Sequence, residues 1–264
     1  MQPLSVNFDP VIFSMGPLQV RWYGLMYVFA FLIGSRLLLK LCKENYVKMA
    51  PERVDMFVFH TIIAMFLGAR ILFVFVYNWD YYSGNLMEIF SVWKGGLSFH
   101  GGFLGFVVVS LIYHYKYNVP FFSIADGIVL CSTPGIFFVR IGNFINGELY
   151  GRITDVPWGM IFQYGGPYPR HPSQLYEAIG EGIILCCLLW FIRKKVKYQG
   201  VLTGIFVMGY GCVRFVMEFF REPDVQLGYY FWGTTTMGQI LCTLMIMLGI
   251  TFLIINLKRK ISIY

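Results

Sequence analysis

The sequence predicts an all-α, polytopic membrane protein with about seven transmembrane helices and a small extracytoplasmic head loop. Of its 264 residues, 57% are hydrophobic and only 13% are charged, whereas a soluble domain has about 25% charged residues. The apolar residues gather in runs of about 20, the length that a helix needs to cross a bilayer. Helices are expected because a spanning segment must satisfy its backbone hydrogen bonds internally. We expect a single integral membrane domain over residues 1–264, without a second soluble domain.

Seven apolar runs qualify as spans. They cover residues 20–41, 54–77, 97–115, 121–140, 173–193, 200–220 and 235–257. The fourth is the weakest because it contains Asp126 and Pro134, and the proline should kink its helix. The longest outer loop, residues 141–172, follows this run, and a loop of such length is usually functional. No cleavable signal peptide is expected, since residues 1–20 contain no Lys or Arg.

The basic residues predict the orientation. The loops of one side contain 12 Lys and Arg residues, and those of the other side contain four. The basic loops are residues 40–53, 114–120, 193–199 and 258–264, and the other loops are residues 1–19, 78–96, 141–172 and 221–234. Cytoplasmic loops carry the basic excess, so the N-terminus should lie outside and the C-terminus in the cytoplasm. The net charge of +7 then reflects topology and gives no support to nucleic-acid binding.

Polar residues concentrate at the outer end of the fourth run. Arg140 is followed by Asn143, Asn146 and Glu148, and glycines that include Gly151 interleave them. One alternative is a helix end capped by polar groups. Four polar side chains within nine residues are too many for a cap, and charge at membrane depth marks a functional site by default.

Two other runs carry polar residues in helical register or beside glycines. Tyr210, Arg214 and Glu218 are spaced four apart, which places them on one helix face. A structural Arg214–Glu218 pair is an equal alternative there, because buried ion pairs can serve packing alone. His100 stands among glycines near the outer start of the third run, where it is either functional or a satisfied core residue. Tyr23 opens the first run and could be an ordinary interfacial aromatic residue.

Two arginines with neighbouring amides predict an anion site open to lipid, where phospholipid head groups are the abundant anions. No metal site is expected, because no His, Asp or Glu pair has ligand spacing. The six cysteines lie in or beside apolar runs without a CxxC pair. We expect them to be small buried hydrophobic residues without a chemical role.

The residues quoted above resemble the prolipoprotein diacylglyceryl transferase family of bacteria. The motifs that carry the resemblance are residues 22–24, 98–102, 140–148, 171–177 and 210–221. They spread over nearly the whole chain in the family's order. Val139 departs from the pattern, since the family usually has glycine before the arginine, and this concerns how closely a neighbouring helix packs. The outer loop also looks short for the family.

The resemblance implies a reaction in the bacterial inner membrane, with the active site toward the outer leaflet. The diacylglyceryl group of phosphatidylglycerol moves to the thiol of the lipobox cysteine in a prolipoprotein signal peptide, and glycerol phosphate leaves. Neither a metal nor a cofactor is implied.

The resemblance also assigns roles to residues. Arg140 and Arg214 would stabilise the phosphate, which a planar guanidinium binds bidentately. A thiol with a pKa near about 8.5 needs a base or a positive field; His100 is the natural base, with Glu148 and Glu218 as rivals. The remaining candidates would bind the head group of phosphatidylglycerol. They are Asn143, Asn146, Tyr23, Tyr210 and Gly151.

A non-catalytic phospholipid or peptide transporter is the alternative, because it also needs charges inside the membrane. Transporters usually show repeated halves and sites near the bilayer midplane. This sequence shows no internal repeat, and its polar groups gather at the outer ends of the predicted helices. A scaffold or assembly factor would not need a histidine beside glycine pairs.

Overall fold

The computed structural model describes residues 3–16, 18–222, 229–230 and 235–263. The chain forms two compact units, Met1–Leu38 with Ala125–Tyr264 and Leu39–Ile124. Within the described residues, five helical segments are long and apolar enough to cross a membrane. They are Trp22–Lys43, Pro51–Tyr77, Phe121–Ile145, Ser173–Ile192 and Met237–Arg259. The chain is therefore a mostly helical, polytopic membrane protein, and the count of seven spans stays a prediction.

Helix α5 (Phe121–Ile145) forms the packing centre of the first unit. Helix α1 (Trp22–Lys43) runs antiparallel along it, because glycines leave room for close contact. A Cβ on Gly135 would lie 3.2 Å from Ala30, and a Cβ on Gly142 would lie 2.9 Å from the Tyr23 ring. Small residues of this kind let membrane helices approach closely.

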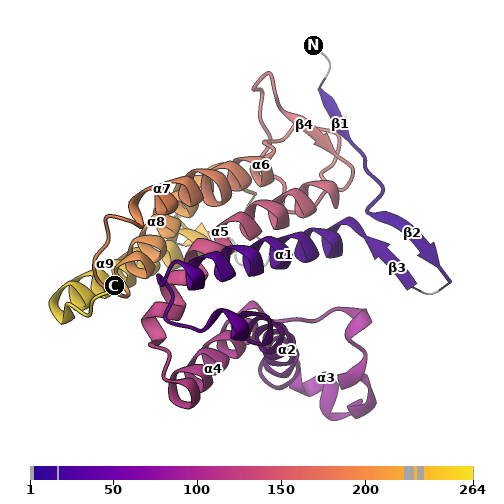
Figure 1. The fold of residues 1–264 in the computed structure, drawn as a ribbon. Coiled ribbons are helices and arrows are strands. Elements are labelled where there is room, and N and C mark those ends of the chain that lie inside the picture. The colour runs from indigo at the N-terminus through magenta and orange to yellow at the C-terminus, as the bar shows by residue number, and fades with distance from the viewer. Residues whose placement is uncertain (1–2, 17, 223–228, 231–234, 264) are drawn as a thin grey trace. The chain divides into compact units, whose positions relative to one another are not determined.

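A second long helix also packs on α5. It consists of α6 (Ser173–Glu177), a π-helical segment η5 (Ala178–Ile184) and α7 (Leu185–Ile192), which form one continuous helix (Figure 1). Trp190 donates its indole N–H to the Leu130 carbonyl at 3.2 Å. A Cβ on Gly182 would meet the Phe137 backbone, so this helix and α5 are nearly in backbone contact.

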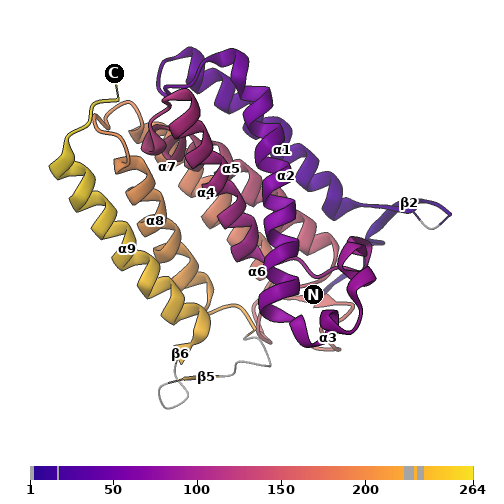
Figure 2. The ribbon, with the colours of Figure 1, turned by 90° about the horizontal axis from the view of Figure 1, so that it is seen from below.

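Helices α8 (Val201–Met217) and α9 (Met237–Arg259) lie side by side (Figure 2). Gly204 and Gly211 of α8 face α9, and Gly249 of α9 faces α8. The start of α8 is capped by Asp126 of α5, whose carboxylate accepts the backbone N–H of Gly200 at 2.6 Å. Asp126 is 1% exposed, so this cap fixes α8 to α5 inside the unit.

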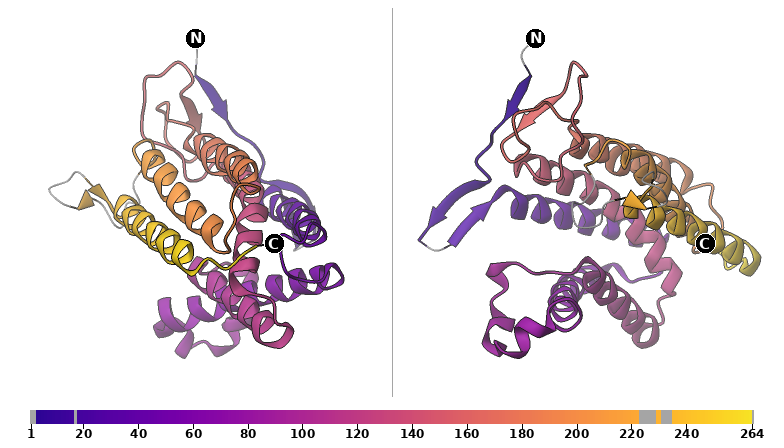
Figure 3. Two further views of the ribbon diagram at one scale, coloured as in Figure 1. Left: turned by 60° about the vertical axis from the view of Figure 1, so that its left-hand side comes forward. Right: turned by 180° about the vertical axis from the view of Figure 1, so that it is seen from behind.

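The expectation of an all-α protein misses three two-stranded sheets among the described residues. β1 (Leu4–Val6) pairs in parallel with β4 (Met160–Phe162), as Figure 3 shows. β2 (Val11–Met15) pairs with β3 (Leu18–Arg21), and β5 (Tyr229–Tyr230) pairs with β6 (Thr235–Thr236), both antiparallel. All three sheets lie outside the helices, where strands of two to five residues leave no readable alternation.

The second unit is built on two packed helices, α2 (Val54–Leu72) and α4 (Phe99–Tyr117). Their glycines meet backbone to backbone: a Cβ on Gly101 would collide with the Gly68 carbonyl, and one on Gly105 with the Ala64 carbonyl. The remaining elements are short. They are η1 (Pro51–Arg53), π-helical η2 (Phe73–Tyr77), α3 (Trp79–Ser83), η3 (Leu86–Phe90) and η4 (Val92–Lys94).

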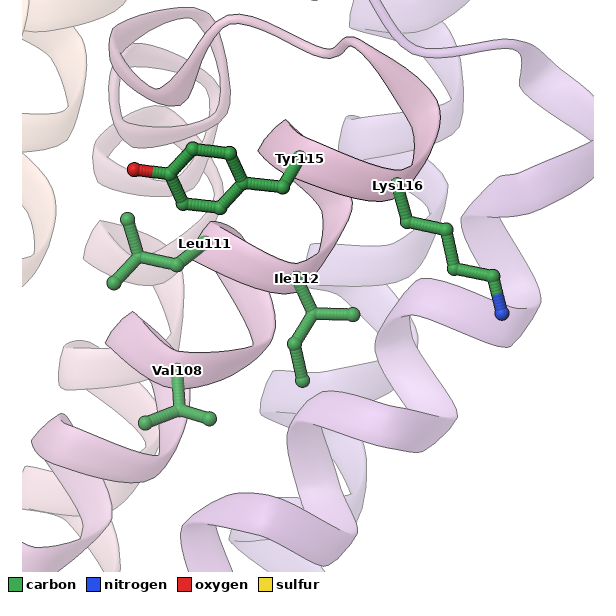
Figure 4. A pocket seen from close by; sticks show the side chains of 5 residues that line it. All are labelled: Val108, Leu111, Ile112, Tyr115 and Lys116. Carbon is green, nitrogen blue, oxygen red and sulfur yellow. The ribbon is translucent and has the colours of Figure 1, made fainter.

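One face of α4 is apolar and carries a surface hollow (Figure 4). Its lining residues are Val108, Leu111, Ile112, Tyr115 and Lys116. Val108 is 53% exposed and Ile112 is 49% exposed, although both are aliphatic. Such a surface suits contact with lipid, and it carries none of the candidate site residues.

The predicted end of the fourth run at residue 140 is too early. α5 continues through Arg140 to Ile145, and Asn146 still donates its backbone N–H to the Gly142 carbonyl at 3.0 Å. Pro134 lies inside α5 and does not end it. Arg140 is therefore held within a helix, and Asn143 lies in the last turn of the same helix.

Candidate active site

Four residues from three helical segments of the first unit form a ring of alternating charge. Arg140 Nη1 lies 3.0 Å from Glu177 Oε2, and Arg140 Nη2 lies 3.0 Å from Glu181 Oε2. Arg214 Nη1 pairs with Glu177 Oε1 and lies 3.8 Å from Glu181 Oε1. Each arginine thus contacts both glutamates, and each glutamate contacts both arginines. We call these four residues the charge ring.

The charge ring is buried on its acidic side. The side chains of Glu177 and Glu181 are 0% exposed, whereas those of Arg140 and Arg214 are 15% and 14% exposed. Removing one partner of a buried ion pair typically costs about 3–5 kcal/mol, because the other charge is left uncompensated. The ring therefore fixes the two guanidinium groups, and a ligand must approach it through the arginines.

The local structure explains how the two carboxylates come to face the arginines. Glu177 ends α6 and Glu181 lies in the π-helical segment η5, so they are one turn apart on one continuous helix. Residues four apart share a helix face. π-helical turns are frequent at functional sites, where they change the direction in which a side chain points.

The ring continues along the end of α8. Arg214 Nη2 lies 2.7 Å from Glu218 Oε2, and Glu218 Oε1 accepts a hydrogen bond from Thr236 Oγ1 at 3.0 Å. Arg221 Nη1 lies 3.7 Å from Glu177 Oε1. The predicted contact between Arg214 and Glu218 is confirmed, but it is one part of a network in which three arginines meet three glutamates.

Three side-chain amides converge on Glu148 and form a second cluster, the amide cluster. Asn143 Nδ2 donates to Glu148 Oε1 at 2.7 Å, and Asn146 Nδ2 donates to the same oxygen at 3.3 Å. Gln174 Nε2 donates to the Glu148 main-chain carbonyl at 2.6 Å. A carboxylate and a carbonyl only accept hydrogen bonds, so these contacts decide which end of each amide faces Glu148.

The opposite ends of these amides are unsatisfied. Asn143 Oδ1, Asn146 Oδ1 and Gln174 Oε1 are buried and have no hydrogen-bond partner within the described residues. A buried acceptor without a partner costs about 1–3 kcal/mol. Each oxygen can therefore gain a hydrogen bond when a donor, such as a hydroxyl group, enters the cluster.

The two candidate tyrosines lie beside these clusters. Tyr23 packs against Gly142 of α5, and its hydroxyl lies 3.4 Å from that of Tyr27. Tyr210 precedes Arg214 by one turn of α8, and Glu181 and Arg140 are its main charged neighbours.

Gly151 is enclosed by backbone. Its N–H donates to the His171 carbonyl at 2.9 Å, and its own carbonyl accepts from Arg170 Nη1 at 3.1 Å. A Cβ at this position would lie 2.5 Å from the Phe220 carbonyl, so no larger residue fits without a shift. The structure thus gives Gly151 a packing role, and its direct contact with a ligand stays a prediction.

His100 belongs to the second unit, at the start of α4. It is exposed, and its Nδ1 lies 3.1 Å from the Tyr77 hydroxyl. The preceding segment is held by Arg70, which is 5% exposed and donates to the Glu88, Ile89, Gly95 and Gly96 carbonyls at 2.8–3.1 Å. The start of α4 is thus well supported, and the role of His100 as a base stays a prediction.

The outer loop contains a chain of hydrogen bonds that the sequence does not reveal. Trp158 donates its indole N–H to the Tyr176 hydroxyl at 2.7 Å, and this hydroxyl lies 3.2 Å from His171 Nδ1. Burial lowers the pKa of His171. These contacts link the outer loop to the start of α6, next to the charge ring.

Sequence reasoning missed Glu181 and gave Glu177 no role, although both complete the charge ring. The available signal was their spacing: two carboxylates one turn apart inside the otherwise apolar run 173–193.

The cysteine expectation is correct in part. Three of the six are buried as expected, whereas Cys187 and Cys212 are exposed.

Comparison with known proteins agrees with the resemblance. The family model for prolipoprotein diacylglyceryl transferase matches residues 10–255. The chain is 48% identical over 247 residues to a phosphatidylglycerol–prolipoprotein diacylglyceryl transferase of Nitratidesulfovibrio vulgaris strain Hildenborough, with 94% of each chain covered. Proteins of the same name from Mannheimia succiniciproducens and Brucella anthropi are 46% and 47% identical. They cover 97% and 92% of this chain, and 96% and 90% of their own lengths.

Proposed function

Because the chain belongs to the prolipoprotein diacylglyceryl transferase family, we propose that it transfers the diacylglyceryl group of phosphatidylglycerol to the lipobox cysteine of prolipoproteins. Glycerol phosphate is the second product. The observation that carries this function is the pair of guanidinium groups that buried carboxylates hold in the charge ring. Fixed cations of this kind match a reaction in which a phosphate group departs.

The reaction forms a thioether in one displacement. The thiolate sulfur attacks the diacylglycerol carbon that carries the phosphate, a C–S bond forms, and the C–O bond breaks. The electron pair stays on the phosphate oxygen of glycerol phosphate, where negative charge develops. Arg140 and Arg214 stabilise this charge, since preorganised donors lower a barrier most where charge appears only in the transition state.

The amide cluster orients the head group. Phosphatidylglycerol presents glycerol hydroxyls, which donate hydrogen bonds, beside an anionic phosphate. The unsatisfied oxygens of Asn143 and Asn146 accept from such hydroxyls. A site built around buried acceptors rejects ligands that lack the matching donor, because the acceptors then stay unpaired. Tyr23 and Tyr210 complete the binding of the head group.

His100 is the proposed base for the substrate thiol, since imidazole accepts protons near neutral pH. Glu218 is a poorer rival because both of its oxygens are engaged, one by Arg214 and one by Thr236. Glu148 is exposed and holds two asparagine amides, so it remains the second choice.

Strand pairing supports seven spans. β1 and β4 are hydrogen-bonded and so lie on one side of the membrane, which requires an even number of crossings between them. Three of the long apolar segments occur in that interval, and a crossing by α4 as the fourth would make the number even. The C-terminal segment also bonds to residues 197–199, which supports a crossing by α8 together with α9. These two helices complete the proposed seven.

The proposed location is the bacterial inner membrane, with the N-terminus outside, the C-terminus in the cytoplasm and the active site toward the outer leaflet. The positive-inside rule supports this orientation, because 12 basic residues lie on the proposed cytoplasmic side. The count of basic residues puts the C-terminus and residues 193–199 on the same side of the membrane, in agreement with the hydrogen bonds between these two segments.

The purified protein tests the function directly. It is incubated with phosphatidylglycerol and a synthetic lipobox peptide, and the peptide is analysed by mass spectrometry. We expect the mass of one diacylglyceryl group on the cysteine, and none on a peptide with serine at that position. Transport of lipid or peptide across a vesicle without any covalent product would instead favour the transporter alternative.

A further inference from the structure

Three arginines of the candidate site are matched in number by the glutamates that they contact. Arg140, Arg214 and Arg221 are matched by Glu177, Glu181 and Glu218, each within 4 Å of an arginine of the set. Stabilising a departing phosphate does not require this balance. Two unpaired arginines would bind an anion more tightly than arginines that already contact carboxylates, so the balance itself needs an explanation.

The geometry leaves both arginines able to bind a ligand. Arg140 uses Nε, Nη1 and Nη2 for one contact each with the ring carboxylates, at 3.0–3.3 Å. A guanidinium has five N–H groups, so one hydrogen on each Nη remains. The carboxylates therefore reduce the affinity of the arginines for an anion without blocking their N–H groups.

Substrate and product differ in charge. The phosphodiester of phosphatidylglycerol carries one negative charge, whereas a phosphate monoester carries about −1.5 to −2 at pH 7, because its second pKa is about 6. Coulomb energy is proportional to the charge of the ligand. A site with excess positive charge would therefore hold glycerol phosphate more tightly than the substrate it must bind next.

We propose that Glu177 and Glu181 act as positioning residues that hold the arginines and keep the site neutral, so that glycerol phosphate can leave after transfer. This inference rests on the proposed function. Glu181 is the better residue to test, because it pairs with Arg140 and Arg214 only, whereas Glu177 also pairs with Arg221. Replacing Glu181 removes a charge and few hydrogen bonds.

The test compares Glu181→Gln with the wild type as full-length protein in nanodiscs. Glutamine keeps the size and one acceptor oxygen for Arg140, and removes one negative charge. If the KM for phosphatidylglycerol falls roughly tenfold, the inhibition constant for added glycerol phosphate should fall roughly 30-fold to 100-fold, since the Coulomb energy grows in proportion to the ligand charge. kcat should fall because product release becomes limiting.

Two further variants separate charge from structure. Glu181→Asp keeps the charge and should show wild-type inhibition by glycerol phosphate, even if its shorter side chain lowers stability. Asp155→Asn removes an exposed carboxylate from the outer loop and should leave inhibition unchanged. Glu218→Gln removes a ring neighbour from Arg214 and should tighten glycerol phosphate binding in the same direction as Glu181→Gln.

Binding of inorganic phosphate, measured by calorimetry without any turnover, completes the test. Folded Glu181→Gln or Glu218→Gln protein that binds phosphate no more tightly than the wild type would overturn the proposal. If Glu181→Gln does not fold, Glu218→Gln decides alone. A wild-type protein that makes no thioether refutes the proposed function instead, so the two failures are distinguishable.

Discussion

Arg140→Lys asks whether the site needs a guanidinium or only a positive charge. Arg140 bridges two buried carboxylates through three nitrogen atoms, at 3.0–3.3 Å. A lysine ammonium is a point charge without the planar fork, so it can replace one of these bridges but not both. One carboxylate of the ring then loses its contact on the α5 side.

The expected losses follow from these contacts. A hydrogen bond to a charged group contributes about 1.5–3 kcal/mol, so the variant should lose roughly this much stability. Loss of one preorganised donor to a developing oxyanion typically lowers the rate by roughly 100-fold to 1000-fold. We therefore expect kcat/KM for thioether formation to fall at least about 100-fold, while expression and membrane insertion stay near normal.

The assay is the initial rate of peptide modification, with the protein level measured on the same samples. Arg36→Lys is the matched control, because Arg36 is an exposed arginine inside α1 and no contact of the charge ring involves it. Arg214→Lys should resemble Arg140→Lys. The bidentate model is wrong if lysine retains most of the activity at both positions, and a loss of protein level alone at Arg214 would indicate a structural pair.

Four further predictions concern other parts of the chain. His100→Gln should lose rate severely and recover partly at higher pH as the substrate thiol ionises by itself; a robust rate with a wild-type pH profile would exclude His100 as the base. Replacing all six cysteines with Ala or Ser should keep turnover, and lost activity in folded protein would indicate a covalent thiol enzyme. Asp126→Ala should destabilise the first unit by about 2 kcal/mol or more, because a buried N-terminal cap and its charged hydrogen bonds are lost; an unchanged melting temperature would contradict this. A single cysteine next to Lys195 should resist a membrane-impermeant reagent in intact cells, and its labelling would reverse the proposed orientation.

Sequence reasoning predicts the arginines of the site and the contact of Arg214 with Glu218, but not the two glutamates of the charge ring. Arg140 and Arg214 are conspicuous because charge is rare in apolar runs. The roles of Glu177 and Glu181 cannot be predicted in this way, since helical spacing tells which residues share a face but not which helix that face meets. The contact between Glu177 and two arginines depends on how three helices rotate and on the π-helical segment η5.

Contacts between distant residues also explain two differences outside the site, the later end of α5 and the short strands. The fourth span is predicted to end at residue 140 because the apolar run ends there and polar residues follow. The helix nevertheless continues to Ile145, since Gly142 packs under Tyr23 and Asn143 bonds to Glu148. The short strands could not be predicted, because β1 pairs with residues more than 150 positions away and shows no pattern of its own.

The charge ring has a consequence for how the chain enters the membrane. α5 carries Arg140 and emerges from the ribosome before either ring glutamate has been made. On translocon insertion scales, a lone arginine costs about 2.5–3.5 kcal/mol at the centre of a helix. Arg140 lies in the outer part of α5, so α5 must tolerate a part of this cost until residues 173–192 follow. These carry two carboxylates, which must in turn wait for Arg214 of α8. Arg140 thus lacks its partners until the second helix arrives, and the second carboxylate of that helix lacks a matching arginine until α8 arrives, which couples the insertion of three successive spans during translation.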